Sequence, residues 1–258
     1  MSLPDVTKTA IKSLLIKIVS DKLKNYNPET NYMPFHYNLL GKDRYAMFSF
    51  MQSMNTTFGM SIWEQVAVIL AKGAGNIAQR QYDLYGQVDD KTEKIISEIT
   101  YNLRKASSEV DKASEIKIIR DNIKQGKTEK DPDSRVDFYV VINGIENYFD
   151  ITSVKPNIKE FAALKAKLLR WVALRLSQND KAKLETRLAI PYNPYYPEPY
   201  QRWTLRGLYD LKNKEILIGE EFWNFVAGDD IYDELLNVFQ DAGLELRDIL
   251  DKKFADFR

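Results

Sequence analysis

The chain has 258 residues, 44% of them hydrophobic, and its 37 basic side chains are balanced by 37 acidic ones. It contains no cysteine and a single histidine, His36, which excludes disulfides, thiolate zinc sites, cysteine nucleophiles and any two-histidine metal site within one chain. No apolar run approaches the roughly 18 residues of a membrane span, and the N-terminus lacks a signal-peptide pattern. We therefore expect a cytoplasmic protein without a membrane partner, folded as a single domain over residues 1–258.

Helical spacing of apolar residues dominates the first half of the chain. This spacing predicts helices over residues 2–24, 42–54 and 61–73, and two helices or one broken helix over 89–125. Ser61 and Glu64 match a capping box at the start of the third helix. Turn-forming or charged residues predict loops over 25–41 and 126–134. We take residues 1–58 as a helical extension and 59–258 as the core of the domain.

The pattern changes to that of an α/β protein after residue 135. Runs of β-branched and aromatic residues predict strands over 136–142 and 145–154, with Pro156 ending the second. A helix over 158–178 and a strand over 184–190 follow, then a Pro/Tyr-rich loop over 191–199. A short strand is expected over 216–218 and a helical C-terminus over 220–257. The prediction is a mixed sheet with flanking helices.

Charge is unevenly distributed over this second half. Residues 151–187 carry nine Lys/Arg against three Asp/Glu, whereas residues 219–258 carry four against eleven. A basic middle and an acidic tail cancel in the total while leaving one positive face, which would suit a nucleic-acid partner. The alternative is two solvated helical surfaces of unequal charge.

Two aspartates flank a hairpin signal. Asn143-Gly144 lies between two apolar runs, which is typical of a two-residue type I′ turn. With this turn, Asp137 faces Asp150 across the hairpin, and directly opposed Cβ atoms lie roughly 4.5–5.5 Å apart. Two like charges at that distance are destabilising unless a cation lies between them, so the pattern favours a divalent metal and nuclease chemistry. The alternative is that Asp137 caps a strand and Asp150 pairs with a nearby basic residue, Lys155 or Arg135.

The same register predicts which face of the hairpin is buried. Tyr139 and Tyr148 share the face of the two aspartates, and Phe138 and Phe149 lie on the other. We expect the phenylalanine face to be the buried one and the aspartates to lie on the more polar side.

A magnesium ion suits these residues. Mg²⁺ takes one or two carboxylates, a backbone carbonyl and waters, which here would be Asp137, Asp150 and the carbonyl of Ile151. Such an ion activates water and neutralises charge on a scissile phosphate. A lysine close to the site would orient the water and stabilise the charged transition state. Lys155, just beyond the second strand, is the candidate.

These residues carry a resemblance to a known nuclease superfamily. An Asp, a spacer of about a dozen residues and then an acid near a lysine is similar to the signature of the PD-(D/E)xK nucleases. More specifically, the chain resembles type II restriction endonucleases of the TdeIII type, roughly from Phe35 to the C-terminus. The matching segments are Asn55–Gln65, Arg135–Phe138, Phe149–Asn157, Ala189–Tyr200 and Glu220–Phe225.

The resemblance implies roles for individual residues. Asp137 and Asp150 correspond to the metal-binding carboxylates, and Glu64 to the first-helix glutamate that many of these nucleases turn toward the metal or its water. The departure is Thr152, because the usual signature has a lysine there. Either Lys155 reaches back toward the metal, or a lysine from elsewhere supplies the charge, or the activity is weak.

The resemblance also implies the overall function. It predicts a Mg²⁺-dependent homodimer that hydrolyses phosphodiester bonds of double-stranded DNA at a short palindromic site, of the GGNCC kind, beside a cognate DNA methyltransferase of the same system. The first alternative is a DNA-binding protein with a decayed nuclease site, since Thr152 replaces the lysine. The second is a helical interaction protein in which the aspartate pair is incidental.

DNA contacts are expected from three places. The helix over 158–178 carries basic residues within about 80° of one another, a face that would track phosphates or simply be solvated. The Pro/Tyr loop and the residues after it offer groups that can read base edges. His36 is expected to be structural. The candidates are Lys159, Lys167, Arg170, Asn193, Gln201, Arg202 and Arg206.

Overall fold

The computed structural model describes residues 2–27, 32–152, 154–200 and 203–255. The helical elements are α1 (Asp5–Asn25), α2 (Pro34–Leu40), α3 (Lys42–Thr57), the π-helical turn η1 (Phe58–Ile62), α4 (Trp63–Gly73), α5 (Asp90–Arg104), α6 (Lys112–Asn122), α7 (Ile158–Gln178), α8 (Trp203–Leu208), α9 (Glu220–Ala227) and α10 (Tyr232–Ala255). The strands are β1 (Ile77–Tyr85), β2 (Lys130–Ile142), β3 (Ile145–Ile151), β4 (Leu184–Ile190) and β5 (Ile216–Ile218).

Within the described residues the strands form one five-stranded mixed sheet in the order β1-β2-β3-β4-β5. The first three strands are antiparallel neighbours, and β4 and β5 run parallel to β3. Parallel strands need a crossover connection, and α7 provides it between β3 and β4. The expected mixed α/β architecture is confirmed.

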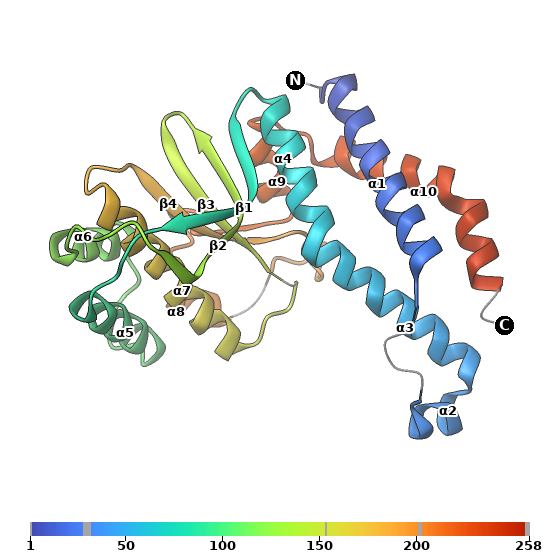
Figure 1. Ribbon diagram of the computed structural model, residues 1–258, viewed down its shortest axis with the longest axis horizontal. Helices are drawn as coiled ribbons and strands as arrows, with labels where there is room; N and C mark the ends of the chain where they lie inside the picture. The colour runs from blue at the N-terminus through green and yellow to red at the C-terminus, as the bar shows by residue number, and fades with distance from the viewer. Residues whose placement is uncertain (1, 28–31, 153, 201–202, 256–258) are drawn as a thin grey trace.

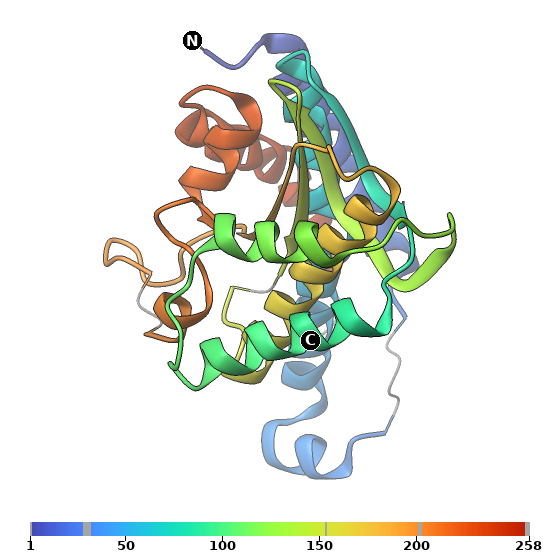
Figure 2. The ribbon, with the colours of Figure 1, turned by 90° about the vertical axis from the view of Figure 1, so that its left-hand side faces the viewer.

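Helices cover both faces of the sheet (Figures 1 and 2). One core joins the sheet to α5, α6, α7 and α8, and the other joins it to α1, α4, α9 and α10. The prediction that only the phenylalanine face of the hairpin is buried is therefore wrong. Tyr148, on the opposite face, is 1% exposed, and it packs in the core beneath α7. A sheet with a parallel part is normally covered on both faces.

The hairpin register agrees with the sequence prediction. The ladder pairs Ile142 with Ile145 and continues without a shift to Phe138 and Phe149. Asn143 has φ 52° and Gly144 has φ 75°, the two left-handed residues that a type I′ turn requires. The regular ladder ends at the pair of Phe138 and Phe149, and beyond it the two strands are joined by the Ile151 amide, which donates to the Asp137 carboxylate at 2.8 Å.

The even-numbered side chains of β1 change from one face of the sheet to the other in the middle of the strand. Ala78 packs in the core beside α4, whereas Leu84 packs in the core beside α7, although both have even numbers. Residues an even number apart in a regular strand face the same side. The break falls at Gln81, whose φ is +50°. Directly across the ladder, β2 reverses between Val136 and Phe138, that is, at Asp137.

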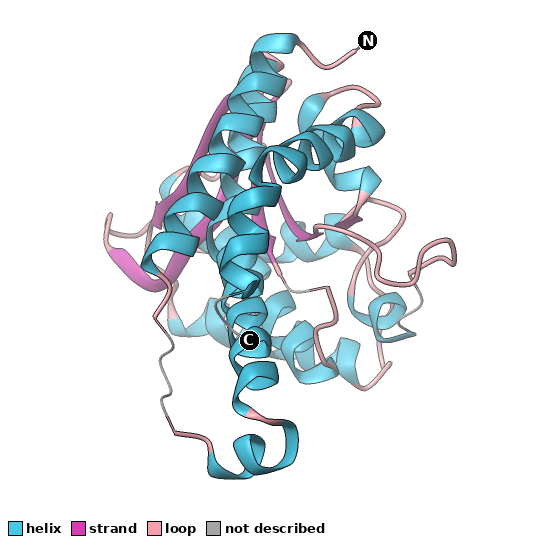
Figure 3. Cartoon of the chain, turned by 90° about the vertical axis from the view of Figure 1, so that its right-hand side faces the viewer, coloured by secondary structure: helices cyan, strands magenta, loops and turns pink. Residues whose placement is uncertain are grey.

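A continuous helical rod leads from α3 through η1 into α4 (Figures 1 and 3). The amide of Trp63 donates to the carbonyl of Phe58, a contact five residues apart that defines the π turn. The predicted helix end at residue 54 and capping box at Ser61 are therefore wrong. The Ser61 hydroxyl instead accepts a hydrogen bond from the Gln65 side chain at 2.8 Å. The expected division after residue 58 falls within this turn.

Several other boundaries differ from the prediction. β1 and α8 lie in segments for which no element was predicted, and α2 lies in an expected loop. β2 begins at Lys130, inside the expected charged loop, and β3 ends at Ile151 rather than at residue 154. The C-terminal helix is divided at Gly228, whose φ of +71° ends α9. Among the described helices none is long and apolar enough to cross a membrane.

A buried ionic network joins α6, α7 and the sheet beneath them. Glu215 accepts from Lys112 at 2.9 Å and from Lys165 at 2.7 Å, and Lys165 also contacts Glu115 at 2.6 Å. These side chains are at most 7% exposed. Thr186 on β4 accepts a further hydrogen bond from Lys112 at 2.7 Å. The network therefore fixes the position of α7 over the sheet.

Glu215→Ala should destabilise the fold because it leaves two buried ammonium groups without their common partner. Breaking a buried pair in this way costs about 3–5 kcal/mol. Urea unfolding followed by circular dichroism measures the loss. Lys117→Ala is the matched control, since it removes an exposed pair with Asp121 that is worth about 1 kcal/mol at most. Equal losses in the two variants would contradict a stabilising role for the network.

Candidate active site

The two aspartates lie at the end of the hairpin away from its turn, at the inner strands of the sheet. The carboxylate of Asp137 accepts a hydrogen bond from the backbone amide of Ile151 at 2.8 Å, which ties β2 to the residue after Asp150. Asp150 is 5% exposed. Burial, followed by the charge of Asp150, raises the pKa of Asp137 to about 7. The fold therefore holds two carboxyl groups close together at a cost to the ionised form of one of them.

A lysine of α7 supplies positive charge beside this pair. The ammonium of Lys167 lies 2.5 Å from Oδ2 of Asp150. It also lies 5.0 Å from the ring centroid of Trp171, one helical turn further along α7. The Lys167 side chain is 32% exposed. The ammonium is therefore anchored on the acid while remaining open to a ligand.

The structure places the predicted lysine elsewhere. The ammonium of Lys155 lies over the ring of Tyr195, 5.1 Å from its centroid. It therefore does not reach back to Asp150, which was the first of the three expected alternatives. Lys167, expected to contact DNA, is the lysine that meets the acid pair. A lysine contributed by another element was the second expected arrangement.

Glu64 reaches the same region from the first turn of α4. It is 3% exposed, and both of its carboxylate oxygens accept from the side-chain amide of Gln81, at 2.7 and 2.8 Å. Arg80 lies 3.3 Å from one of these oxygens. Burial raises the pKa of Glu64, although Gln81 and Arg80 oppose the shift. The charge of Glu64 in turn contributes to raising the pKa of Asp137.

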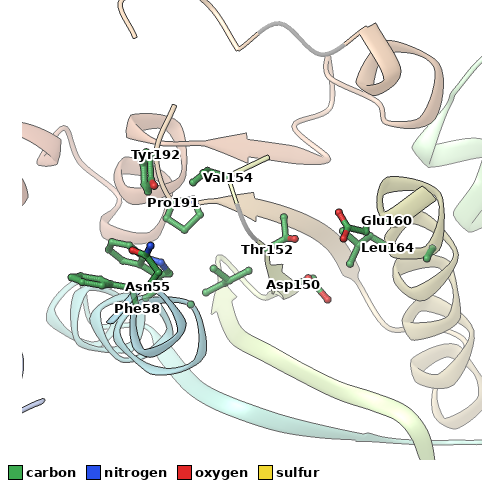
Figure 4. A pocket seen from close by; sticks show the side chains of 13 residues that line it. Asn55, Phe58, Asp150, Thr152, Val154, Glu160, Leu164, Pro191 and Tyr192 are labelled. Carbon is green, nitrogen blue, oxygen red and sulfur yellow. The ribbon is translucent and has the colours of Figure 1, made fainter. Parts of the chain in front are cut away.

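A cleft of about 800 Å³ opens beside Asp150 (Figure 4). Its walls come from the rod of α3, η1 and α4, from the ends of β3 and β4, and from α7. Asn55 and Phe58 lie on one side of the cleft and Glu160 and Leu164 on the other, with Asp150 and Thr152 between them. The remaining lining residues are Gly59, Trp63, Ile151, Val154, Ala163, Pro191 and Tyr192.

A second hollow, of about 710 Å³, lies between α5 and α7. Lys159, Lys167 and Arg170 all line it, as the helical spacing predicted, together with Arg104. Arg170 is held by ion pairs with Glu93 and with Asp131. Ala163 lines both hollows. A basic groove therefore adjoins the acidic cleft across α7.

The other DNA-contact candidates are distributed over the Pro/Tyr loop and beyond. Asn193 closes its own loop, because its amide donates to the carbonyl of Glu198 at 2.7 Å and accepts from the Tyr195 amide at 3.0 Å. Gln201 and Arg202 lie outside the described residues. Arg206 belongs to α8, and its side chain is not among those described.

The donor set near Asp150 fits a magnesium ion. The part of the chain described here has no cluster of three or more acidic or histidine side chains that could hold a metal. Asp137 and Asp150 nevertheless offer two neighbouring carboxylates, and Ile151 offers a backbone carbonyl at the same strand end. Mg²⁺ commonly binds one or two carboxylates and keeps several waters. Burial and then the charge of Asp150 raise the pKa of Asp137, and a divalent cation would offset the effect of that charge.

Comparison with known proteins places this geometry in a family. Residues 3–243 match the family model described as type II restriction endonuclease, HinfI. The chain belongs to this family. The type II restriction enzyme HgiCII of Herpetosiphon aurantiacus is 25% identical over 98% of this chain and 99% of its own length. HgiEI and HgiBI of the same organism are 24% and 23% identical, each over 95% of this chain and 96% of its own length.

This membership makes the chain a site-specific endonuclease by family, acting on DNA. The sequence analysis reached the type II restriction endonuclease class. It gave no role to Gln81 and gave Lys167 a DNA-contact role only. The signal for Gln81 is weak, since one amide in a strand of ordinary composition carries no motif. The contact of Lys167 with Asp150 left no local signal either, because it depends on how the crossover helix α7 packs over the end of β3.

Asp137→Asn should stabilise the protein at pH 8 in the absence of divalent metal. The folded pKa of Asp137 is about 7, whereas an unperturbed Asp titrates near 3.9. The wild-type protein therefore loses stability as pH rises from about 4 to about 7, while the Asn variant does not. Thermal unfolding at pH 4.5 and at pH 8 should show the gain only at the higher pH. A gain of equal size at both values would contradict this explanation.

Proposed function

We propose that the chain is a Mg²⁺-dependent type II restriction endonuclease that hydrolyses phosphodiester bonds in double-stranded DNA. The observation that carries the proposal is Asp150 in the wall of a cleft, with Asp137 beside it and the Lys167 ammonium on it. Two carboxylates beside a cation and an open cleft suit the in-line displacement of a phosphate ester.

The acid pair would hold the ion. Asp137, Asp150 and the carbonyl of Ile151 are the ligands we propose, with Glu64 turned toward the ion or its water. When bound, Mg²⁺ would supply Lewis-acid activation of water and charge neutralisation at the phosphate. The chain itself fixes the two carboxylates through the Ile151 amide and the sheet register.

We propose that Lys167 takes the role of the lysine that the PD-(D/E)xK signature has at the position of Thr152. Its ammonium contacts Asp150 and is partly exposed, so it can also donate to a phosphate oxygen in the cleft. A positioned cation of this kind stabilises the negative charge that develops during phosphoryl transfer. Lys155 would instead act at the rim of the cleft, over Tyr195.

The groove between α5 and α7 gives the DNA backbone a route past the site. Lys159 is exposed on this groove, and Lys167 lies between it and the acid pair. Contacts with phosphates fix the register of a protein on a duplex without reading its sequence. Base reading by Asn193, Gln201, Arg202 and Arg206 is part of the proposal and rests on their positions in the sequence after β4, where Pro191 and Tyr192 line the cleft.

The remaining features of the proposal follow from the resemblance to TdeIII-type enzymes of the PD-(D/E)xK superfamily. A duplex presents two antiparallel strands, and a two-fold homodimer would offer one acid pair to each. The recognised site would then be palindromic, of the GGNCC kind. A cognate methyltransferase would protect the same site in the cytoplasm of the host.

A DNA-binding protein with a decayed site is the competing proposal, and Thr152 is its motivation. The position of Lys167 favours the enzyme, because it restores a cation at the acid pair. If the protein is incubated with mixed-sequence plasmid DNA and Mg²⁺, discrete bands of cleaved DNA would indicate the enzyme. Retarded but intact DNA would indicate the binder.

Asp150→Asn should abolish Mg²⁺-dependent cleavage while DNA binding persists. The substitution keeps the shape of the side chain but removes the proposed metal-binding charge. Plasmid cleavage gives the activity, and a gel-shift assay without metal gives the binding. Undiminished cleavage by this variant would eliminate the proposed site.

Lys167→Met should lower the single-turnover cleavage rate by about 10²–10³-fold, the usual cost of removing one group that stabilises transition-state charge. Lys155→Met is the matched control and should leave the rate of the chemical step close to that of the wild type. Rapid-quench measurements at saturating DNA compare the two. A larger loss of rate in Lys155→Met than in Lys167→Met would instead assign the catalytic role to Lys155.

A further inference from the structure

We propose that Gln81 is a positioning residue, which holds the Glu64 carboxylate in place beside the acid pair. This inference rests on the role proposed for Glu64. Gln81 lies in the middle of β1, at the ladder position across from Asp137, between the paired residues Arg80 and Tyr82. It therefore lies at the same level of the sheet as the two aspartates.

The contact between the two side chains is bidentate. One Gln81 amide nitrogen donates to Oε1 of Glu64 at 2.7 Å and to Oε2 at 2.8 Å. Both oxygens of a 3% exposed carboxylate are thus engaged by a single group. Holding both oxygens limits rotation of the carboxylate about its last bond, which a contact to one oxygen would not do.

A second contact fixes which way the Gln81 amide points. Its carbonyl oxygen accepts a hydrogen bond from Arg135 at 3.3 Å. Arginine can only donate and an ionised carboxylate can only accept. The amide oxygen must therefore face Arg135 and the amide nitrogen must face Glu64. Arg135 is in turn paired with Asp83 at 3.1 Å, so the orientation is fixed from β2 through β1 to α4.

The backbone at Gln81 indicates that its side chain matters. Its φ of +50° lies in the left-handed region, where glycine, asparagine and aspartate are the usual residues. This conformation reverses the inward alternation of β1 at the level of Asp137. If only the left-handed backbone conformation mattered at this position, glycine would adopt it with less strain. A long amide at this position is explained by its contact with Glu64.

Arg80 does not substitute for Gln81. It approaches only one oxygen of Glu64, at 3.3 Å, and its side chain is 39% exposed. Gln81 is therefore the residue that engages both oxygens of Glu64, while Arg80 adds a positive charge beside one of them.

The first test compares Gln81→Glu with Gln81→Gly in single-turnover cleavage over a range of Mg²⁺ concentrations. Gln81→Glu keeps the length of the side chain and an oxygen for Arg135, but it faces Glu64 with a second carboxylate. Gln81→Gly keeps the left-handed backbone and removes the amide.

We expect each variant to cleave about 10- to 100-fold more slowly, the usual cost of removing an outer partner of a metal site, and to need more Mg²⁺. DNA binding without metal should be unchanged. Wild-type rates in Gln81→Glu would overturn the proposal, because a purely structural role needs only the oxygen that Arg135 contacts.

The second test is a double-mutant cycle with Glu64→Gln. If Gln81 acts through Glu64, Gln81→Gly should slow the wild type but leave the rate of Glu64→Gln unchanged. Equal losses in both backgrounds would overturn the proposal while leaving the function of Glu64 intact. A wild-type rate for Glu64→Gln would instead remove Glu64 from the proposed site, and with it the positioning role of Gln81. Loss of cleavage in Asp150→Asn is independent of both outcomes.

Discussion

The repulsion between Asp137 and Asp150 is the constraint around which the rest of the site is arranged. The register of the hairpin forces the two carboxyl groups together, and burial strengthens their interaction, because charges interact more strongly in a medium of low dielectric constant. Burial is the main cause of the raised pKa of Asp137, and the charge of Asp150 raises it further. Each neighbouring group either offsets the repulsion, as Lys167 and the Ile151 amide do, or adds to it, as Glu64 does. A site that is costly without a cation is well suited to binding one.

Different parts of the chain bring these groups together. The hairpin and α7 form a compact unit in which Asp150 and its lysine are only 17 residues apart. Glu64 and its glutamine come from α4 and β1, across the opposite side of the sheet. The buried ionic network around Glu215 fixes the position of α7 over the sheet. Stability in the core and geometry at the site are therefore linked through one helix.

The sequence predicted the parts of this fold that depend on local rules. Turn chemistry predicted the hairpin register, a stripe of apolar residues at helical spacing predicted α7, and β4 was predicted as a further strand. The failures share a different cause. Gln81 adopts a left-handed conformation inside a strand, which no local preference for glutamine indicates, and β1 was missed with it. The part of Lys167 at the acid pair depends on how a crossover helix packs on the sheet, a tertiary contact that leaves no pattern in the chain.

The π turn between α3 and α4 has a consequence for how such enzymes can vary. A π turn contains one residue more than the α-helical turn it replaces, and such turns are frequent at functional sites. Deleting one residue there would restore a regular helix and rotate everything before it by about 100° relative to Glu64. Asn55 would then leave the wall of the cleft, while the acid pair stayed where it is. The rotation of α3 relative to the candidate site thus depends on a single residue, so a one-residue deletion or insertion would change the wall of the cleft that α3 provides and leave the acid pair in place.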